Sequence, residues 1–167
     1  MRERLTPQDV EKIQQEIDHR KLVVRKKAIE AVKEARAQGD LSENFEYYAA
    51  KREKNQNESR IRYLERVLKT AEIITDHSGE DEVGLDNTVT LYVEEDDVEE
   101  TYRLVTSIRG NSLEGLISTE SPIGKAIMGH KVGDRVLVQV NDQYGYYVEI
   151  RKIEKTRDES GDRIRSY

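Results

Sequence analysis

Two carboxylates, Asp40 and Glu43, stand three residues apart in the stretch Gly39–Asn44. Mg²⁺ prefers oxygen ligands in octahedral geometry and commonly takes one or two carboxylates together with waters and phosphates. Two carboxylates alone are too few to hold the ion well. They could, however, share it with a molecule that supplies the other ligands. There they could retain the second metal ion of a phosphoryl-transfer site and orient an attacking water.

The same pair also has a purely structural interpretation. Asp-x-x-Glu at the start of a helix is a capping box, in which side chains satisfy free backbone N–H groups. Both charges would also suit the positive end of the helix. On the pattern alone, capping is the more frequent role of such a pair. The choice between the two roles depends on the rest of the chain.

Helical sequence flanks this stretch on both sides. Apolar or small residues recur at intervals of three, four or seven, as in a helix that packs on one partner. They are Val10, Ile13, Ile17, Val24, Ala28, Ala31 and Ala35 before the stretch, and Tyr47, Ala50, Ile61, Leu64, Leu68 and Ala71 after it. We therefore predict an antiparallel helical hairpin with an acidic tip. At 1.5 Å rise per residue, its arm is roughly 45 Å long.

The ends of both helices can be predicted. Thr6 is the expected N-cap of the first helix, which covers residues 7 to about 38. Gly39 can supply the positive φ that ends this helix. The second helix is expected from about residue 41 to 75, with Asp40 at its start.

Polar residues interrupt both apolar stripes. Arg20 occupies a stripe position in the first helix, as do Lys54 and Asn57 in the second. Pairing at equal distances from the tip would set Asn57 near residues 26–27 and Leu64 near Arg20. A polar residue in such a seam can fix its register, although a hydrated seam is equally consistent with the pattern.

The periodicity changes to that of strands after the second helix. We expect strands at 88–93, 102–105, 113–117, 136–140 and 146–150, and a short helix capped by Ser121 with Pro122 at its first position. The predicted class is α+β. Its parts are an arm over residues 1–76, a linker over 77–82, a sheet-rich domain over 83–155 and a disordered tail over 156–167.

Composition excludes several classes of protein. Charged residues form 37% of the chain and hydrophobic residues 35%, so a single large core is not expected. The net charge of −6 gives no support for general binding to duplex nucleic acid. There is no cysteine, and the three histidines are too far apart to suggest a zinc motif. No apolar run suggests a membrane span or signal peptide, so a cytoplasmic protein is expected.

The tip stretch closely resembles the signature of bacterial Gre factors, the GreA/GreB family of transcript cleavage and elongation factors. The agreement continues through Glu46-Tyr47, Ala49-Ala50-Lys51, Arg60-Ile61, Leu64-Glu65 and Ala71, and returns at Ser121–Ala126, Gly129 and Val132-Gly133-Asp134. It spans nearly the whole chain in the right order. The resemblance implies an N-terminal antiparallel coiled coil followed by an FKBP-like domain.

The resemblance also implies a function without an active site of the factor's own. The C-terminal domain would dock at the rim of RNA polymerase's secondary channel, and the coiled coil would enter it. Asp40 and Glu43 would then help to hold the polymerase's second Mg²⁺ and activate water beside an extruded RNA 3′ end. The polymerase would cut its own transcript and restart. No other cofactor is implied, and an intrachain hairpin predicts a monomer.

The tip differs from the family pattern in two ways. Ser42 stands where relatives often carry a basic residue, and Phe45 and Tyr48 make the tip more aromatic than expected. With Asn44, these residues would lie close to the RNA. Phe45 or Tyr48 could stack on an extruded base, although packing across the hairpin turn explains them equally well.

Two further sets of residues are candidates for binding. Arg36, Lys51, Arg52 and Arg60 could form a basic face near the tip that guides RNA. A solvated, salt-bridged face is the more frequent role of such a mixture of charges. The resemblance implies polymerase docking through Ser121, Pro122 and Ile123, which could equally serve only to begin a helix.

Three other functions compete with cleavage stimulation. An inhibitory paralogue would occupy the channel without promoting cleavage. A peptidyl-prolyl isomerase is suggested by the FKBP-like fold, but that fold's active isomerases line their pocket with aromatic residues. This chain has no Trp, and its one Phe lies at the tip. A plain coiled-coil adaptor would use the two acids only as caps.

Overall fold

The computed structural model describes residues 2–39, 44–156 and 161–166. It divides into two units, a hairpin built from residues 10–71 and a sheet unit built from residues 3–9 and 72–167. The first residues therefore belong with the C-terminal part, unlike the predicted division at residue 76. The reason is a short parallel pairing of β1 (Arg4–Leu5) with β2 (Glu72–Ile73).

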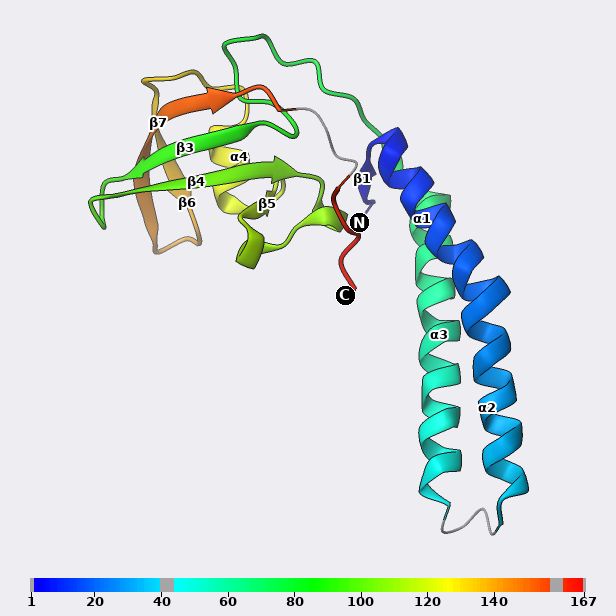
Figure 1. Ribbon diagram of the computed structural model, residues 1–167. Coiled ribbons are helices and arrows are strands. Elements are labelled where there is room, and N and C mark those ends of the chain that lie inside the picture. Colours follow the sequence, from blue (N-terminus) through cyan, green and yellow to red (C-terminus); the bar gives the residue numbers. More distant parts are fainter. Residues whose placement is uncertain (1, 40–43, 157–160, 167) are drawn as a thin grey trace. The chain divides into compact units, whose positions relative to one another are not determined.

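The hairpin consists of two antiparallel helical segments (Figure 1). The first contains α1 (Pro7–His19), a π-helical segment η1 (Arg20–Val24) and α2 (Arg25–Ala37). The second is α3 (Phe45–Thr70). The predicted helical hairpin is confirmed, but the second helix begins and ends four to five residues inside its predicted bounds of 41 and 75.

A reciprocal capping box starts α1. The backbone N–H of Asp9 donates to Thr6 Oγ1 at 3.1 Å, and the N–H of Thr6 donates to Asp9 Oδ2 at 3.0 Å. Both residues are buried. The predicted N-cap at Thr6 is confirmed, and Asp9 satisfies a second free donor.

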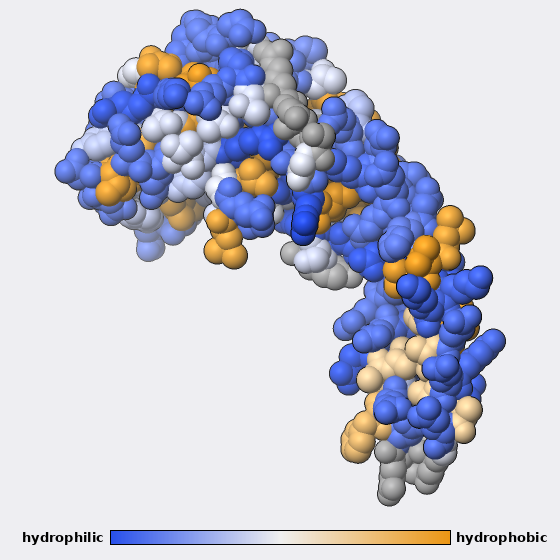
Figure 2. Space-filling model, viewed as in Figure 1, coloured by the Kyte–Doolittle hydropathy of each residue, from blue (hydrophilic) through white to orange (hydrophobic). Residues whose placement is uncertain are grey.

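The apolar seam is tightest in the half of the hairpin away from the α2–α3 connection. Ile13, Ile17, Ile61 and Leu64 are each 3% exposed or less. The face of the hairpin seen in Figure 2 is mainly hydrophilic. One stripe of each helix therefore carries the hydrophobic stabilisation of this unit.

The apolar stripe departs from its expected positions at one residue beyond η1. Ala28 is half-buried and Ala35 is buried, as expected, but Ala31 is exposed and the next residue, Val32, is half-buried in its place. Leu22 and Ile29 are 74% and 37% exposed. A π-turn hydrogen-bonds residue i to i+5 and so inserts one extra residue into a helix, which accounts for a seam position that falls one residue later than expected.

A polar network fills the seam at η1. Arg20 donates from Nε to Glu16 Oε2 at 2.7 Å and from Nη1 to Asn57 Oδ1 at 3.0 Å. Arg60 donates from Nε and Nη2 to the two carboxylate oxygens of Glu16, at 2.9 and 3.3 Å. Asn57 and Arg60 are 4% and 3% exposed. Asn57 bonds Arg20 and not residues 26–27 as expected, whereas the neighbouring ion pair of Arg25 with Glu58, at 2.9 Å, lies close to the expected register.

The sheet unit contains a five-stranded sheet in the order β5-β4-β3-β7-β6. Its strands are β3 (Thr88–Val93), β4 (Val98–Val105), β5 (Leu116–Ser118), β6 (Arg135–Gln139) and β7 (Gly145–Glu154). All neighbours are antiparallel except β4 and β5. The predicted α+β class is confirmed. The strand expected at 113–117 begins later, because Ser112–Glu114 form a 3₁₀ turn, η3.

One face of the sheet and the short helix α4 (Pro122–Ile127) enclose the core of this unit. Fully buried Leu91, Leu104, Val148 and Ile150 meet Ile127 there. Alternate burial along β3 and β6 follows the period of two that predicted these strands. A further 3₁₀ turn, η2 (Ser107–Arg109), follows β4 and precedes η3.

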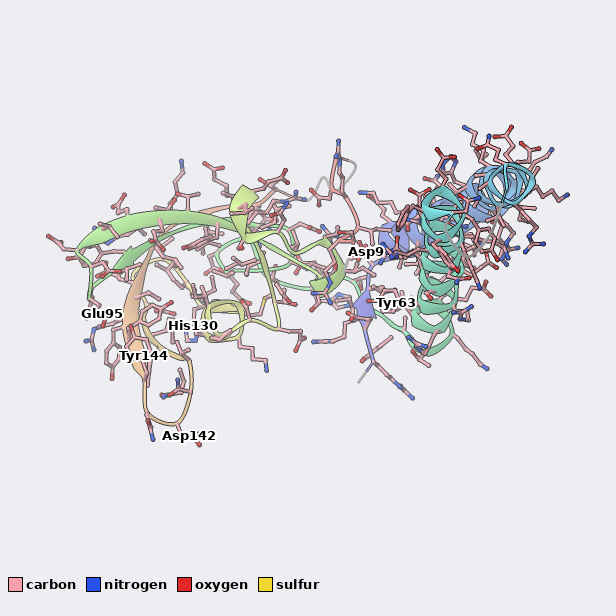
Figure 3. The ribbon with its side chains drawn as sticks, turned by 90° about the horizontal axis from the view of Figure 1, so that it is seen from below. Asp9, Tyr63, Glu95, His130, Asp142 and Tyr144 are labelled. Carbon is pink, nitrogen blue, oxygen red and sulfur yellow. The ribbon has the colours of Figure 1, made fainter. Side chains whose placement is uncertain are left out.

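A buried ion cluster ties four segments of the sheet unit together. Arg109, which is 1% exposed, bonds Asp9 Oδ1 at 2.7 Å, Asp86 Oδ1 at 2.6 Å and Asp162 Oδ2 at 2.7 Å. Asp9 is labelled in Figure 3. The prediction of a disordered tail is wrong for residues 161–166, because Asp162 pairs with Arg109 and Arg103, and the Arg165 N–H donates to the Ile108 carbonyl.

The polar network predicts an acid-sensitive hairpin. Burial opposes ionisation of Glu16, but hydrogen bonds and charge from Arg60 and Arg20 outweigh it, so its pKa lies below the ordinary value of 4.5. A lowered pKa stabilises the folded state above the unfolded-state pKa, and this stabilisation disappears as the pH falls through the folded-state pKa. We expect the unfolding free energies of the wild type and Glu16→Gln to differ most at neutral pH and to converge below pH 4.5.

Urea titrations followed by helical circular dichroism at several pH values would measure this difference. Glu11→Gln is a matched control, because Glu11 is exposed on the same helix. A gap between wild type and Glu16→Gln that stays constant with pH would contradict the role given to the Glu16 carboxylate.

Candidate functional site at the hairpin end

The two carboxylates of the candidate site lie in the connection between α2 and α3. Asp40 and Glu43, with Ser42, fall outside the described residues, which resume at Asn44. The residues on either side are described. Gly39 has φ 140°, a conformation that favours glycine, and it follows the end of α2. The two helix ends on either side of this connection are the described part of the site.

Asn44 joins the two helix ends. Its side-chain oxygen accepts a hydrogen bond from the Tyr47 N–H at 3.0 Å, which makes it the N-cap of α3. Its amide Nδ2 donates to the carbonyl oxygen of Ala35, in the last turn of α2, at 2.5 Å. One side chain thus satisfies a free donor of α3 and adds a hydrogen bond to a carbonyl of α2, which also accepts from the Gln38 N–H at 3.3 Å.

This cap changes the interpretation of the acidic pair. The N-cap of α3 is Asn44 and not Asp40, and α3 begins at Phe45. Sequence reasoning missed this cap, because Asp40 and Asn44 are both good N-cap residues and only the geometry selects one. The capping requirement of α3 is met without either acid.

A cation–aromatic contact supports the same end of the hairpin. The Arg36 guanidinium lies 5.6 Å from the ring centre of Tyr47 and donates to its hydroxyl at 3.5 Å. The hydrogen bond from Arg36 lowers the pKa of the Tyr47 hydroxyl. The rings of Tyr47 and Tyr48 meet edge to face, with centres 5.4 Å apart. These contacts join α2 to the first turn of α3.

Phe45 is the most solvent-accessible aromatic side chain described at this end. It is 86% exposed, and Tyr48 is 48% exposed. An exposed Phe gains little from packing, so the expected packing of Phe45 across the turn is not supported among the described residues. Phe45 instead offers a free ring face beside the acidic connection.

The predicted basic face is smaller than expected. Arg36, Lys51 and Arg52 are exposed. Arg60 does not belong to this face, because its guanidinium is buried in the seam on Glu16 and lies 5.4 Å from the ring centre of Tyr63. The stripe gap at Asn57 was a sign of a polar seam, but the sequence did not show that Arg60 would join it.

The residues predicted to dock on a partner lie at the start of α4. Ser121 accepts from the Gly124 N–H at 3.0 Å and caps the helix, as predicted. Pro122 is exposed at the first helical turn, whereas Ile123 packs partly against the core. Of the three, Pro122 has the most accessible side chain.

The described ranges hold no group of three or more His, Asp or Glu side chains that could bind a metal ion. The described helices include none long and apolar enough to cross a membrane. In the sheet unit, the Tyr144 hydroxyl donates a hydrogen bond to Glu95, and both residues are labelled in Figure 3.

Comparison with known proteins decides the family. A model described as "Transcription elongation factor, N-terminal" matches residues 3–73, and one described as "Transcription elongation factor, GreA/GreB, C-term" matches residues 78–155. The chain belongs to the GreA/GreB family of transcription elongation factors. The family resemblance predicted from the tip stretch and the α4 segment is thereby confirmed.

Individual relatives agree with this family. The chain is 43% identical over 135 residues to Transcription elongation factor GreA of Bacillus subtilis (strain 168), covering 81% of this chain and 86% of that protein. It is 46% identical over 136 residues to GreA of Geobacillus kaustophilus, with the same coverage. Among solved structures, the transcription factor Gfh1 is similar at 28% identity and a TM-score of 0.45, covering 92% of this chain and 97% of that one.

The double role of Asn44 can be tested by separating its two hydrogen bonds. Asn44→Asp keeps the N-cap acceptor but replaces the donor to Ala35 by a carboxylate oxygen. Asn44→Ala removes both bonds. We expect Asn44→Ala to lower the unfolding free energy by about 1 kcal/mol, the usual effect of a lost N-cap, and Asn44→Asp to lose only the link to α2.

Amide hydrogen exchange would distinguish the two effects. Protection in the first turn of α3 should survive in Asn44→Asp, while protection in the last turn of α2 falls in both variants. Equal protection of the α2 end in the wild type and both variants would contradict the link between Asn44 and Ala35.

Proposed function

We propose that this elongation factor binds bacterial RNA polymerase in the cytoplasm and stimulates the polymerase's own Mg²⁺-dependent cleavage of backtracked RNA. The hairpin enters the secondary channel, and the sheet unit docks at its rim through the Pro122 region. The observation that carries the proposal is that α3 is capped by Asn44, so that Asp40 and Glu43 are not needed for that cap. This supports a role for the two acids outside the fold.

The donor set fits a shared metal ion. Two carboxylates three residues apart supply a minority of an octahedral shell, so a partner would have to supply the remaining ligands. Asp40 and Glu43 would hold a Mg²⁺ that polymerase also ligates, and the ion would favour hydroxide formation and neutralise phosphate charge. The factor therefore acts as an activator, with no complete active site of its own.

Other residues near the tip have supporting roles in this proposal. Phe45, with its exposed ring, stacks on a base of the extruded RNA 3′ segment. Arg36 holds Tyr47 and the helix ends in place. Lys51 and Arg52 lie exposed on the next turns of α3, where they attract phosphates.

An inhibitory role is the alternative within the same family. An inhibitor would occupy the channel without cleavage. The acids at positions 40 and 43 favour stimulation, because a pure blocker needs no metal ligands. The two roles differ in one product, the shortened RNA.

The experiment adds the full chain and Mg²⁺ to stalled polymerase complexes and measures RNA cleavage. We expect the wild type to shorten the RNA. Asp40→Asn with Glu43→Gln keeps shape and hydrogen-bonding capacity but removes both charges. It should reduce cleavage at least tenfold without reducing the affinity for polymerase, because only the metal-bound step loses its ligands.

The matched control is Glu46→Gln with Glu53→Gln, which removes two exposed charges from α3 close to the same end. This variant should cleave like the wild type. Slower synthesis without any shortened RNA, for the wild type itself, would support the inhibitory role and overturn the proposal. Full cleavage by the Asp40→Asn, Glu43→Gln variant would show that the acids have no part in it.

A further inference from the structure

The π-helical segment η1 lies where the seam is most polar. The backbone oxygen of Arg20 takes part both in the π-turn and in the polar contacts of the seam. The carbonyl oxygen of Arg20 accepts the N–H of Arg25, five residues later, which defines the π-turn. The same oxygen accepts from Asn57 Nδ2 at 3.3 Å. Because a carbonyl has two lone pairs, both bonds can form together. Asn57 of α3 therefore bonds directly to the backbone oxygen at the π-turn.

The sequence of the first helical segment of the hairpin, residues 7–37, is compatible with two arrangements, one with the π-turn and one that is α-helical throughout. An uninterrupted α-helix would place Val24, Ala28, Ala31 and Ala35 on α3, which is the stripe that the periodicity predicts. With the π-turn, Val24, Ala28 and Ala35 still lie in the seam, but Val32 and not Ala31 is half-buried between them. The two arrangements therefore differ most clearly in whether residue 31 or residue 32 faces α3. Both leave small or apolar side chains in the seam, so apolar packing discriminates weakly between them.

We propose that Arg20 and Asn57 are positioning residues that hold η1 as a π-turn. They thereby set the rotation of α2 about its axis and its position along that axis, in the half of the hairpin that carries the tip. The Arg20 side chain bonds Asn57 Oδ1 and Glu16, while Asn57 Nδ2 bonds the Arg20 carbonyl. These bonds pair residue 20 with residue 57. A buried polar residue that specifies register is a known use of polar groups in helical seams.

The consequence for function follows from helix geometry. If η1 became α-helical, α2 would turn by about 100° relative to α1 and shift by about 1.5 Å along the axis. The connection that carries Asp40 and Glu43 would move with it. A displacement of about 1 Å at a reacting centre can reduce a rate by about 100-fold. This step rests on the proposed cleavage function, whereas the phase of the helix does not.

Chemical labelling can measure which of residues 31 and 32 faces α3, because the chain has no cysteine of its own that would react. Ala31→Cys and Val32→Cys are made separately, and the ratio of their rates with a maleimide is measured. In the wild-type background the cysteine at position 31 should react several times faster than that at position 32. In a background of Arg20→Leu with Asn57→Leu the ratio should fall below one.

This double variant leaves no orphan charge, since Glu16 keeps both hydrogen bonds from Arg60. Replacing a paired buried polar group by apolar residues is often neutral or stabilising, so we expect urea stability to be retained while the phase changes. The control is Arg25→Gln with Glu58→Gln, which removes a half-exposed ion pair next to η1 but keeps the Arg20 carbonyl bonds. Its labelling ratio should equal that of the wild type.

Cleavage of backtracked RNA is then compared at saturating factor. The Arg20→Leu, Asn57→Leu variant should bind polymerase as the wild type does and cleave about 100-fold more slowly. An unchanged labelling ratio in this variant would overturn the proposal, and so would a reversed ratio with full cleavage.

The test still gives an answer if the wild type does not stimulate cleavage or if the double variant does not fold. If the wild type itself does not stimulate cleavage, the proposed function fails, while the labelling ratio still decides whether Arg20 and Asn57 hold the π-turn. If the double variant does not fold, Arg20→Lys replaces it, because Lys keeps the charge and the stem but loses the planar fork that bonds Glu16 and Asn57 together. A wild-type labelling ratio in Arg20→Lys would then count against the proposal.

Discussion

The two long helices of the hairpin contact each other through only one stripe of side chains on each helix, and the order of the hairpin depends on this single seam. Two helices side by side have no third layer to bury further side chains, so every contact that orders the unit lies in one seam. Apolar packing of Ile13, Ile17, Ile61 and Leu64 closes the half away from the acidic connection. The other half has mostly small side chains and relies on hydrogen bonds at fixed points, which are the η1 network and the Asn44 cap.

Polar contacts in such a seam give less stability than specificity. A buried carboxylate–guanidinium pair gains Coulomb energy but loses hydration, and its net contribution is often small. Its geometry, however, is satisfied in only one arrangement. Glu16, Arg20, Asn57 and Arg60 therefore select one phase among packings that would otherwise be similar in energy. The sheet unit has a similar arrangement at Arg109, where three carboxylates fix the chain ends to η2 and the loop before β3.

Much of this fold can be predicted from periodicity and capping residues. The helical hairpin, the strands β3, β6 and β7, and the capped helix α4 follow from patterns of 3.6 and 2 and from Thr6, Ser121 and Pro122. The π-turn could not be predicted, because an α-helical stripe fits the same residues and the decisive bonds come from distant Asn57. The tail contact of Asp162 was missed for a similar reason, since its buried partner Arg109 lies 53 residues away.

In the proposed function, the hairpin end reaches RNA inside a backtracked polymerase. A photo-crosslinking phenylalanine analogue at position 45, where the native ring is 86% exposed, would detect this contact when the factor is irradiated on complexes with labelled RNA. We expect adducts to the extruded 3′ segment, increasing with the length of RNA that is backtracked. Adducts to polymerase alone, with no labelled RNA attached in backtracked complexes, would show that the hairpin end does not reach the RNA.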